Sequence, residues 1–239
     1  MLTIAVVGQK GGSGKSTVVW ALGNAALGRG KRVVMIETDP QGSTLDYVER
    51  AQAKYPGIAE QLVGTMLRSS DAEEIDTILT ELGEQGFDYC LIDTQGSHSE
   101  LSRALMVMVD RIIIPAMPVE HVYRSQMATV AAYEDVRRLL LEDDPAAFVP
   151  PCGILLNAFK ANDRMNAEQA QAFELFTAHE LTLPFFLPQR NGFQTLGSGK
   201  VISQEIEATS DPRDWVRRDA HRRDLAEANA VLEAIEGMA

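Results

Sequence analysis

Short apolar runs alternate with longer segments of helical spacing along most of the chain. Apolar runs rich in β-branched residues predict strands at residues 2–7, 31–37, 89–92, 111–115, 148–159 and 181–187. Apolar positions at helical spacing predict helices at residues 18–28, 44–54, 71–84, 99–108, 120–141, 166–179 and 214–236. Alternation of this kind predicts an α/β fold, with a mostly parallel twisted sheet and helices on both faces.

Turn-forming residues mark several ends of these predicted elements. The sequence Tyr55-Pro56-Gly57 breaks the second helix, and Asp71 is a suitable N-cap for the third. Residues 58–70 show no clear period, and we expect a short strand followed by a loop there. The acidic residues 142–144 precede Pro145 and are interpreted as the solvated end of the long helix.

A glycine-rich segment separates the first predicted strand from the first helix: Gly8-Gln9-Lys10-Gly11-Gly12-Ser13-Gly14-Lys15-Ser16-Thr17. Glycine lets the backbone turn so that successive N–H groups point into one concavity, and the helix start adds free N–H groups and its dipole. We expect Lys15 to reach the β- and γ-phosphates of a nucleotide, and the Ser16 hydroxyl to bind Mg²⁺. Gly11 to Thr17 are therefore the expected nucleotide-binding residues, against the alternative of a glycine-rich turn without a ligand.

Lysine occurs twice in this segment, which sets it apart from an ordinary phosphate-binding loop. The ordinary pattern G-x-x-x-x-G-K-[ST] has a glycine where this chain has Gln9. The stretch from Lys10 to Ser16 fills every position of Lys-Gly-Gly-x-Gly-Lys-[Ser/Thr], the deviant Walker A motif, and the chain resembles the ParA/MinD family of ATPases. The resemblance implies one P-loop NTPase domain over residues 1–239, with catalytic roles for Lys15 and, at the phosphates of a partner subunit, for Lys10. The alternative for Lys10 is a solvated loop lysine.

Two carboxylates follow the second predicted strand, in Glu37-Thr38-Asp39-Pro40-Gln41. The carboxyl end of a parallel strand is where α/β sheets bind their ligands. The family carries Asp-x-Asp-Pro-Gln here, so the resemblance implies that Asp39 places the attacking water and belongs to the outer surroundings of the magnesium. Glu37 stands where the family has its first aspartate, with a side chain longer by one methylene, and its role stays open. The alternative for Asp39 is an Asp-Pro turn without chemistry.

A Walker B pattern follows the third apolar run. Residues 89–92 lead into Asp93-Thr94-Gln95-Gly96. A hydrophobic strand that delivers one carboxylate beside a phosphate loop is placed to hold Mg²⁺ or its water, and we assign this role to Asp93. The family has Asp-Thr-Pro or Asp-Thr-Ala here, so Gln95 departs from it, and Gly96 indicates a flexible switch loop.

The resemblance also implies contacts with the adenine base near the ends of the last two predicted strands. Asn157 matches a family asparagine that reads the base, and an amide offers both the donor and the acceptor that adenine requires. Pro188 and Gln189 lie where relatives place a proline-containing loop against the base. The alternative for Asn157 is an asparagine that caps a strand turn.

Charge is distributed unevenly along this acidic chain, whose net charge of −12 does not suggest a DNA-binding protein. Residues 190–223 nevertheless hold seven Lys and Arg against five Asp and Glu. The resemblance to ParA-type ATPases implies a surface for non-specific DNA, which would use Arg190, Lys200, Arg213, Arg217, Arg218, Arg222 and Arg223. The alternative is a solvated helix with internal salt bridges.

Other features argue against several classes of protein. There is no run of about 18 apolar residues, so we expect no membrane span, and the start of the chain lacks the basic region and cleavage site of a signal peptide. Cys90 and Cys152 lie in apolar strands far apart in sequence, which favours buried free thiols over a disulfide. The four histidines show no ligand spacing, so we expect no zinc site.

The resemblance makes an ATP-dependent switch of the ParA type the first hypothesis. ATP and Mg²⁺ would close two subunits into a homodimer that binds non-specific DNA, and a partner protein of the ParB type would stimulate slow hydrolysis. Such a protein is expected in the cytoplasm, associated with the nucleoid. It would partition or position plasmid DNA, chromosomal DNA or another cargo, or serve as an accessory ATPase of conjugative or virulence DNA transfer.

Two other hypotheses come from different classes. A membrane-surface regulator like MinD needs a basic amphipathic helix at a terminus, but residues 227–239 contain three Glu and no Lys or Arg. Iron–sulfur relatives need cysteine ligands near a dimer axis, but Cys90 falls inside the Walker B strand, which argues against this class. Tyrosine-kinase relatives need a tyrosine cluster near a terminus, which the sequence lacks. A ligase like dethiobiotin synthetase stays open, although such an enzyme need not have the second lysine.

Overall fold

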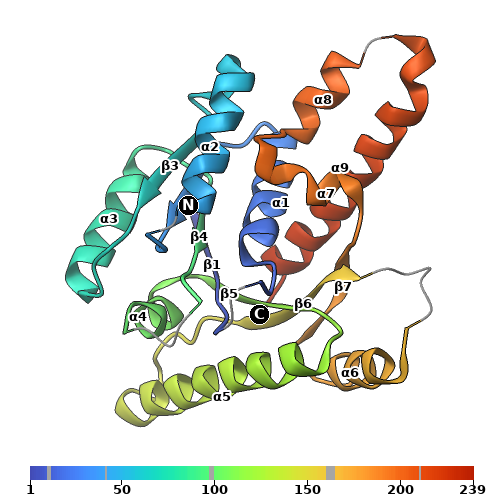
Figure 1. Cartoon of the computed structure of the whole chain (residues 1–239). Coiled ribbons are helices and arrows are strands. Elements are labelled where there is room, and N and C mark those ends of the chain that lie inside the picture. The colour runs from blue at the N-terminus through green and yellow to red at the C-terminus, as the bar shows by residue number, and fades with distance from the viewer. Residues whose placement is uncertain (10–11, 41, 97–99, 160–164, 210) are drawn as a thin grey trace.

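A seven-stranded parallel sheet forms the centre of the molecule (Figure 1). The computed structural model describes residues 1–239 apart from residues 10, 11, 41, 97–99, 160–164 and 210. The strands are β1 (Leu2–Val6), β2 (Val33–Glu37), β3 (Leu62–Met66), β4 (Tyr89–Asp93), β5 (Arg111–Ala116), β6 (Cys152–Phe159) and β7 (Thr182–Pro188). Their order is β3-β2-β4-β1-β5-β6-β7, and every neighbouring pair runs parallel. The predicted α/β fold is confirmed.

Helices connect the strands, as the alternation in the sequence predicts. They are α1 (Lys15–Gly28), α2 (Ser43–Lys54), α3 (Ala72–Glu84), α4 (Glu100–Met108), α5 (Glu120–Asp143), α6 (Ala167–Thr177), α7 (Asn191–Gln194), α8 (Ile202–Ala208) and α9 (Trp215–Glu236). Short 3₁₀ turns lie at Pro56–Ile58, Leu196–Ser198 and Pro212–Asp214. The sequence does not predict α7 and α8, because helices of four and seven residues are too short to show a hydrophobic period.

Successive strand residues divide the core into two layers. On β1, Ile4 and Val6 join one layer, whereas Ala5 joins the other. The first layer packs against α1, α2, α7, α8 and α9, and the second packs against α3, α4, α5 and α6 (Figure 1). The sheet therefore has helices on both faces, as predicted.

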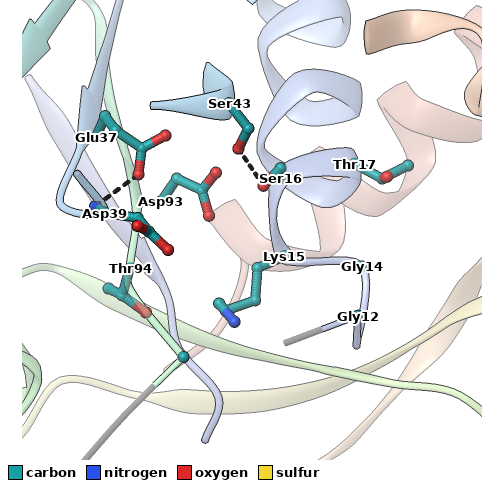
Figure 2. A pocket seen from close by; sticks show the side chains of 11 residues that line it. Gly12, Gly14, Lys15, Ser16, Thr17, Glu37, Asp39, Ser43, Asp93 and Thr94 are labelled. Carbon is teal, nitrogen blue, oxygen red and sulfur yellow. Dashed lines mark hydrogen bonds between the residues drawn. The ribbon is translucent and has the colours of Figure 1, made fainter. Parts of the chain in front are cut away.

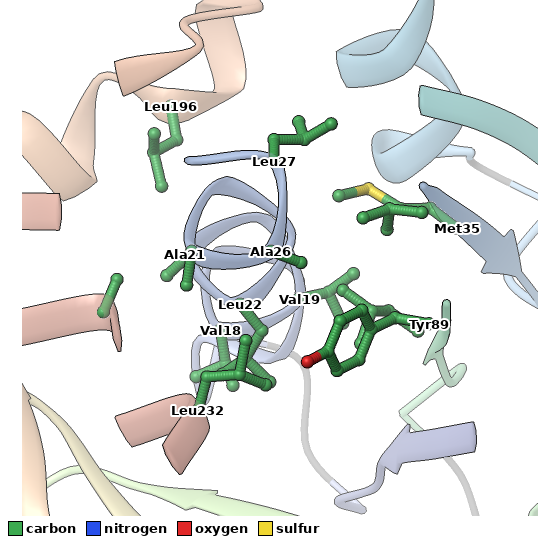
Figure 3. Packing of buried hydrophobic residues seen from close by; sticks show 14 of the residues in the cluster. Val18, Val19, Ala21, Leu22, Ala26, Leu27, Met35, Tyr89, Leu196 and Leu232 are labelled. Carbon is green, nitrogen blue, oxygen red and sulfur yellow. The ribbon is translucent and has the colours of Figure 1, made fainter. Parts of the chain in front are cut away.

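Helix α1 is buried on nearly all sides, because it lies between the sheet and α9. Val18, Val19 and Leu22 are fully buried in the cluster that Figure 3 shows. Gly28 allows α9 to come close, since a Cβ there would stand 2.9 Å from Leu225 Cδ1. Burial stabilises by roughly 1.5–3 kcal/mol for each Val or Leu side chain. This packing fixes the start of α1 at the carboxyl edge of the sheet.

The strand register brings three connecting segments together at that edge. Val6 pairs with Asp93 across β1 and β4, and Asp93 pairs with Glu37 across β4 and β2. The segments that follow β1, β2 and β4 therefore start at the same level of the sheet. The glycine-rich segment, Asp39 and Thr94 all belong to them.

Two predicted boundaries differ from the structure for local reasons. The strand predicted at residues 148–159 begins only at Cys152, because Pro150 and Pro151 lack the N–H group that a sheet ladder needs. The helix predicted from residue 18 already begins at Lys15, directly after Gly14, whose left-handed backbone (φ 89°) ends the loop.

Candidate functional site

A cavity of 240 Å³ opens at the carboxyl edge of the sheet. Figure 2 shows the carboxylates of Glu37, Asp39 and Asp93 on one side of it, and the start of α1 with Lys15 and Ser16 on the other. Its remaining lining comes from Gly12, Gly14, Thr17, Ser43, Thr94 and Gly96. The structure thus brings together residues predicted to contact phosphate and magnesium. The predicted residues Lys10 and Gly11 lie outside the part of the chain that is described.

Two glycines set the geometry of the phosphate loop. Gly14 is the N-cap of α1 with φ of 89°, and Gly12 has φ of 82°, in the left-handed region that glycine adopts without strain. A Cβ at Gly14 would also stand 2.8 Å from Asn157 Nδ2. Lys15 and Ser16 open the first turn of the helix, where backbone N–H groups have no partner within the helix. This helix end suits an anion such as a phosphate.

The ammonium group of Lys15 is buried near three carboxylates. Burial lowers the pKa of Lys15, and the negative charges of Asp93, Asp39 and Glu37 act against that shift. A phosphate in the cavity would add a strong acceptor beside the lysine, an arrangement that favours its charged form.

Asp93 is almost fully buried and its carboxylate is held by hydroxyl groups. The Thr44 hydroxyl donates a hydrogen bond of 2.7 Å to Asp93 Oδ2. Burial raises the pKa of Asp93, whereas hydrogen bonds from Ser16 and Thr44 lower it. Ser16 Oγ also lies 3.1 Å from Ser43 Oγ (Figure 2). Mg²⁺ prefers oxygen ligands, so the Ser16 hydroxyl with the carboxylates of Asp93 and Asp39 is a donor set that fits this ion.

Glu37 braces the segment that carries Asp39. Its two carboxylate oxygens accept backbone N–H groups from Asp39 at 2.8 Å and from Thr44 at 2.9 Å. Burial raises the pKa of Glu37, and these N–H groups act in the opposite direction. In this structure Glu37 therefore ties Asp39 to the start of α2, and its carboxylate also lines the cavity.

Asn157 packs against the phosphate loop. It is 3% exposed, and its Nδ2 donates to the Ser13 carbonyl at 2.8 Å. In this structure the amide supports the loop, and the contact with adenine remains a prediction. Pro188 ends β7 and Gln189 follows it, but neither residue lines the cavity at Lys15, so their base contacts also remain predictions.

Two contacts to the phosphate loop come from α5, where the sequence singles out no residue. The Gln9 N–H donates to Thr129 Oγ1 at 3.4 Å. A Cβ at Gly8 would stand 3.1 Å from Gln126 Oε1, and Gln126 Nε2 donates to the Pro115 carbonyl at 2.6 Å. Thr129 and Gln126 lie in the middle of a long helix, so their contacts with the phosphate loop become apparent only in the folded structure.

A family model, described as VirC1 protein, matches residues 1–237. The chain belongs to the VirC1 protein family. This match, with the motif from Lys10 to Ser16, also confirms the predicted membership of the ParA/MinD group of deviant Walker A ATPases.

Curated relatives match part of this VirC1-family chain. Protein virC1 of Rhizobium rhizogenes is 30% identical over 110 residues, which are 45% of this chain and 46% of the relative. The maintenance of carboxysome distribution protein A of Synechococcus elongatus is 28% identical over 148 residues, 48% of this chain and 58% of the relative. The chain thus spans about half the length of these curated relatives.

Solved structures show the same fold over the whole chain. Apo McdA of Cyanothece has a TM-score of 0.68 at 20% identity, covering 99% of this chain and 100% of that one. A variant of Cyanothece McdA in complex with ATP has a TM-score of 0.65 at 19% identity, covering 100% of this chain and 97% of that one. This likeness confirms the P-loop NTPase fold of the VirC1-family chain.

Most of the arginines predicted to contact DNA make ion pairs in this VirC1-family chain. The pairs join Arg190 to Glu227 (2.7 Å), Arg213 to Asp211 (2.6 Å), Arg217 to Glu205 (2.8 Å) and Arg223 to Asp219 (3.2 Å). Among residues that the structure describes, Arg218 and Arg222 have no acidic side chain within ion-pair distance. Of these four pairs, the one between Arg223 and Asp219 lies within α9, as the alternative of a helix with internal salt bridges expects, whereas the pair between Arg213 and Asp211 lies in the short turn before α9 and the other two join α9 to different segments. Arg218 and Arg222 remain candidates for phosphate contacts.

Lys200 does not belong to the exposed basic surface that the sequence predicts. It is 8% exposed, because it lines a cavity among α2, α7, α8 and α9. The prediction that Lys200 contacts DNA from an open surface is therefore corrected.

Two further expectations concern membranes and cysteines. In the described part of this VirC1-family chain, no helix combines the length and the apolar character needed to cross a membrane. Cys90 and Cys152 are buried free thiols, as predicted.

Proposed function

We propose that this chain is a ParA-type ATPase that binds ATP with Mg²⁺ and hydrolyses it to ADP and phosphate. The observation that carries the proposal is the single cavity in which Lys15, Ser16, Asp39 and Asp93 meet (Figure 2). Lys15 would neutralise the β- and γ-phosphates, while Ser16 and Asp93 would hold Mg²⁺ directly or through water. The ion would supply charge neutralisation at the phosphates. The ATP complex of the McdA variant, which has the same fold, supports the choice of nucleotide.

Hydrolysis needs a positioned water and positive charge near the γ-phosphate. Asp39 lines the cavity and its backbone N–H is held by Glu37, which supports a role in which its carboxylate would orient the water. The motif assigns the added positive charge to Lys10, which would reach the phosphates of a second subunit in a face-to-face homodimer. Turnover would stay slow until a partner protein of the ParB type stimulates it.

The nucleotide-bound dimer would bind non-specific DNA through α9, which would place it on the nucleoid. Arg218 and Arg222 are spaced i, i+4 and therefore share a face of this helix. Exposed ion pairs such as that between Arg223 and Asp219 contribute little energy, so such arginines can exchange a carboxylate for a DNA phosphate. Dimerisation would double this surface and strengthen binding.

The cargo of such a switch would be a plasmid, a chromosome or another body. The match to the VirC1 family is compatible with an accessory role in conjugative or virulence DNA transfer. One relative is named for the maintenance of carboxysome distribution, so a protein body is also a candidate cargo.

The test is binding to a non-specific DNA duplex with ATP and Mg²⁺, with ADP and without nucleotide, at several salt concentrations. Strong binding only with ATP, weakening steeply with salt, is the expected result. The double variant Arg218→Ala/Arg222→Ala should weaken binding and flatten the salt dependence. The matched control, Arg137→Ala/Arg138→Ala, removes the same charge from α5, where both arginines pair with acidic residues of that helix.

Each possible outcome tests a different part of the proposal. Equal loss in both double variants would mean that net charge matters and that α9 is not the DNA surface. Absence of DNA binding in every nucleotide state, together with intact ATP hydrolysis, would keep the ATPase and remove DNA as its platform. Absence of ATP binding would overturn the proposed function itself.

A further inference from the structure

A second cavity, of 480 Å³, lies among α2, α7, α8 and α9. None of the residues that line it lines the nucleotide cavity. Four ionisable residues on its wall are buried: Lys200, Glu205, His221 and Asp224. Charged side chains are rarely buried unless they are paired, so each of these four residues is expected to have an ion-pair or hydrogen-bond partner.

Lys200 is a buried cation of this wall that forms no direct ion pair with the described residues. Among residues that the structure describes, no carboxylate lies within ion-pair distance of its ammonium group. Its backbone is fixed on both sides, since its N–H donates to the Leu196 carbonyl at 3.2 Å and the Tyr47 hydroxyl donates to its carbonyl at 3.3 Å. Burial lowers the pKa of Lys200, and the negative charges of Asp224 and Glu205 act against that shift.

Both buried carboxylates of the cavity are engaged by other cations. Glu205 accepts from Lys54 at 2.7 Å and from Arg217 at 2.8 Å. Asp224 lies 3.8 Å from the guanidinium of Arg190. In the described part of the chain neither carboxylate lies within ion-pair distance of the Lys200 ammonium, and both attract it only at longer range.

His221 is a second polar group of the wall without a hydrogen-bond partner. It is 7% exposed, and within the described part of the chain both ring nitrogens lack a partner. Its Nε2 lies 3.9 Å from Glu205 Oε2, which is too far for a hydrogen bond. Burial and the nearby charge of Lys200 lower the pKa of His221, so the ring is neutral near pH 7 and carries one N–H donor.

We propose that this cavity binds a small molecule bearing a phosphoryl group, with Lys200 as counter-ion and His221 as hydrogen-bond donor. A phosphoryl group fits better than a carboxylate, because lysine binds phosphate as a point charge, whereas Arg217, the arginine of this wall that could match a carboxylate, already donates to Glu205. The ligand would place a negative charge in direct contact with the Lys200 ammonium.

The size and depth of the cavity narrow the ligand further. The cavity volume of 480 Å³ is larger than a single phosphate group needs, since one water molecule occupies roughly 30 Å³ in the liquid. Asn191, Thr195 and Ser198 also line it, and their amide and hydroxyl groups can bind hydroxyls of a sugar. Because Lys200 is recessed in the cavity, a small sugar phosphate can reach it, whereas the backbone of a duplex lying across α9 would be held at the rim.

The first test is calorimetric titration of inorganic phosphate and ribose 5-phosphate into the full chain. The phosphate loop is blocked in two independent ways, by saturation with ADP and Mg²⁺ or by the substitution Lys15→Ala. We expect binding at one site in both cases, tighter for ribose 5-phosphate and unaffected by a DNA duplex. Lys200→Met should weaken it by about tenfold or more, and Arg222→Met, at an exposed cation of α9, should leave it unchanged.

Thermal unfolding gives a second readout that does not depend on the nucleotide. Added ribose 5-phosphate should raise the melting temperature of the wild type and leave that of Lys200→Met unchanged. Equal stabilisation of both proteins by ribose 5-phosphate would overturn the proposal, as would the absence of binding in the first test.

The proposal goes beyond the ATPase function and does not depend on it. Failure of ATP to bind at Lys15 would leave the titration in the Lys15→Ala background valid. Conversely, a chain that hydrolyses ATP but binds no phosphate compound at Lys200 would keep the proposed function and lose only this second site.

Discussion

The hydroxyl of Thr44 donates a hydrogen bond of 2.7 Å to Oδ2 of Asp93, and this oxygen of Thr44 in turn accepts the indole N–H of Trp20 at 2.9 Å. Thr44 is fully buried at the start of α2, and its own N–H is bound by Glu37. The proposed magnesium-binding carboxylate is therefore fixed by a side chain from one helix and, through it, by a second helix.

Replacing Thr44 by valine should impair catalysis, because it removes the hydroxyl while keeping the shape of the side chain. Asp93 and Trp20 would each lose a partner in a buried place, at a cost of about 1.5–3 kcal/mol in the free energy of unfolding. We expect ATP turnover to fall about tenfold as the carboxylate loses its fixed orientation. Thr44→Ser keeps the hydroxyl and should retain most of the activity. Equal turnover in both variants would show that the bond does not position Asp93.

Trp20 should report on magnesium–nucleotide binding through its fluorescence. The chain has two tryptophans, and Trp215 is 62% exposed on α9, so Trp215→Phe leaves Trp20 as the sole emitter. Because Trp20 is joined to Asp93 through Thr44, a change at this carboxylate alters the surroundings of the indole. We expect the emission of Trp215→Phe to change with ATP and Mg²⁺ and to revert with EDTA. The same change without Mg²⁺ would exclude this route.

Replacing Lys10 or Lys15 by alanine should have different effects on ATP binding and on dimerisation. Lys15→Ala removes the charge at the phosphates within one subunit and should abolish ATP binding. Lys10→Ala should keep measurable nucleotide binding and lose ATP-dependent dimerisation, because the motif assigns its contact to a second subunit. Light scattering measures the dimer, and fluorescent nucleotide titration measures binding. Normal dimerisation of Lys10→Ala would contradict the assignment in trans.

Gly14 should tolerate no side chain. Its φ of 89° costs other residues about 1–2 kcal/mol, and a Cβ would press on the Asn157 amide at 2.8 Å. Gly14→Ala should therefore lower both the free energy of unfolding and the affinity for ATP. The control is Gly83→Ala on α3, where a Cβ meets nothing within 4 Å and the helix should gain up to about 1 kcal/mol. Denaturant unfolding of both variants measures the contrast.

The predictions that succeed from sequence rest on local chemistry. Gly12 and Gly14 are needed for a backbone turn, and Asp93 ends an apolar strand, so their places follow from neighbours along the chain. The alternation of strand and helix similarly predicts the sheet and its two covered faces.

The parts that the sequence does not predict depend on contacts between distant segments. The pairing of Glu37 with the N–H groups of Asp39 and Thr44 depends on the exact turn between β2 and α2. The burial of Lys200 depends on how α7, α8 and α9 close over α2. Lysine in a basic segment is ordinarily exposed, so composition alone points to the wrong environment.

Glu205 links α8 to two other helices through charged contacts. Lys54 reaches it from α2, the hydroxyl of Tyr55 donates to it, and Arg217 reaches it from α9. Burial alone would raise the pKa of Glu205, but these hydrogen bonds and charges outweigh burial and lower the pKa from 4.5 to about 2.

The low pKa of Glu205 should make stability depend on pH in a defined window. A carboxylate with a depressed pKa stabilises the folded state fully above its ordinary value of 4.5, and this contribution is lost as pH falls towards about 2. The loss amounts to about 3 kcal/mol, at 1.36 kcal/mol for each unit of pKa. Urea unfolding at pH 7, 4.5 and 3 should show a smaller decline in Glu205→Gln than in the wild type. Glu207→Gln, an exposed change on the same helix, should follow the wild type, and a decline of equal size in all three proteins would refute the role of Glu205.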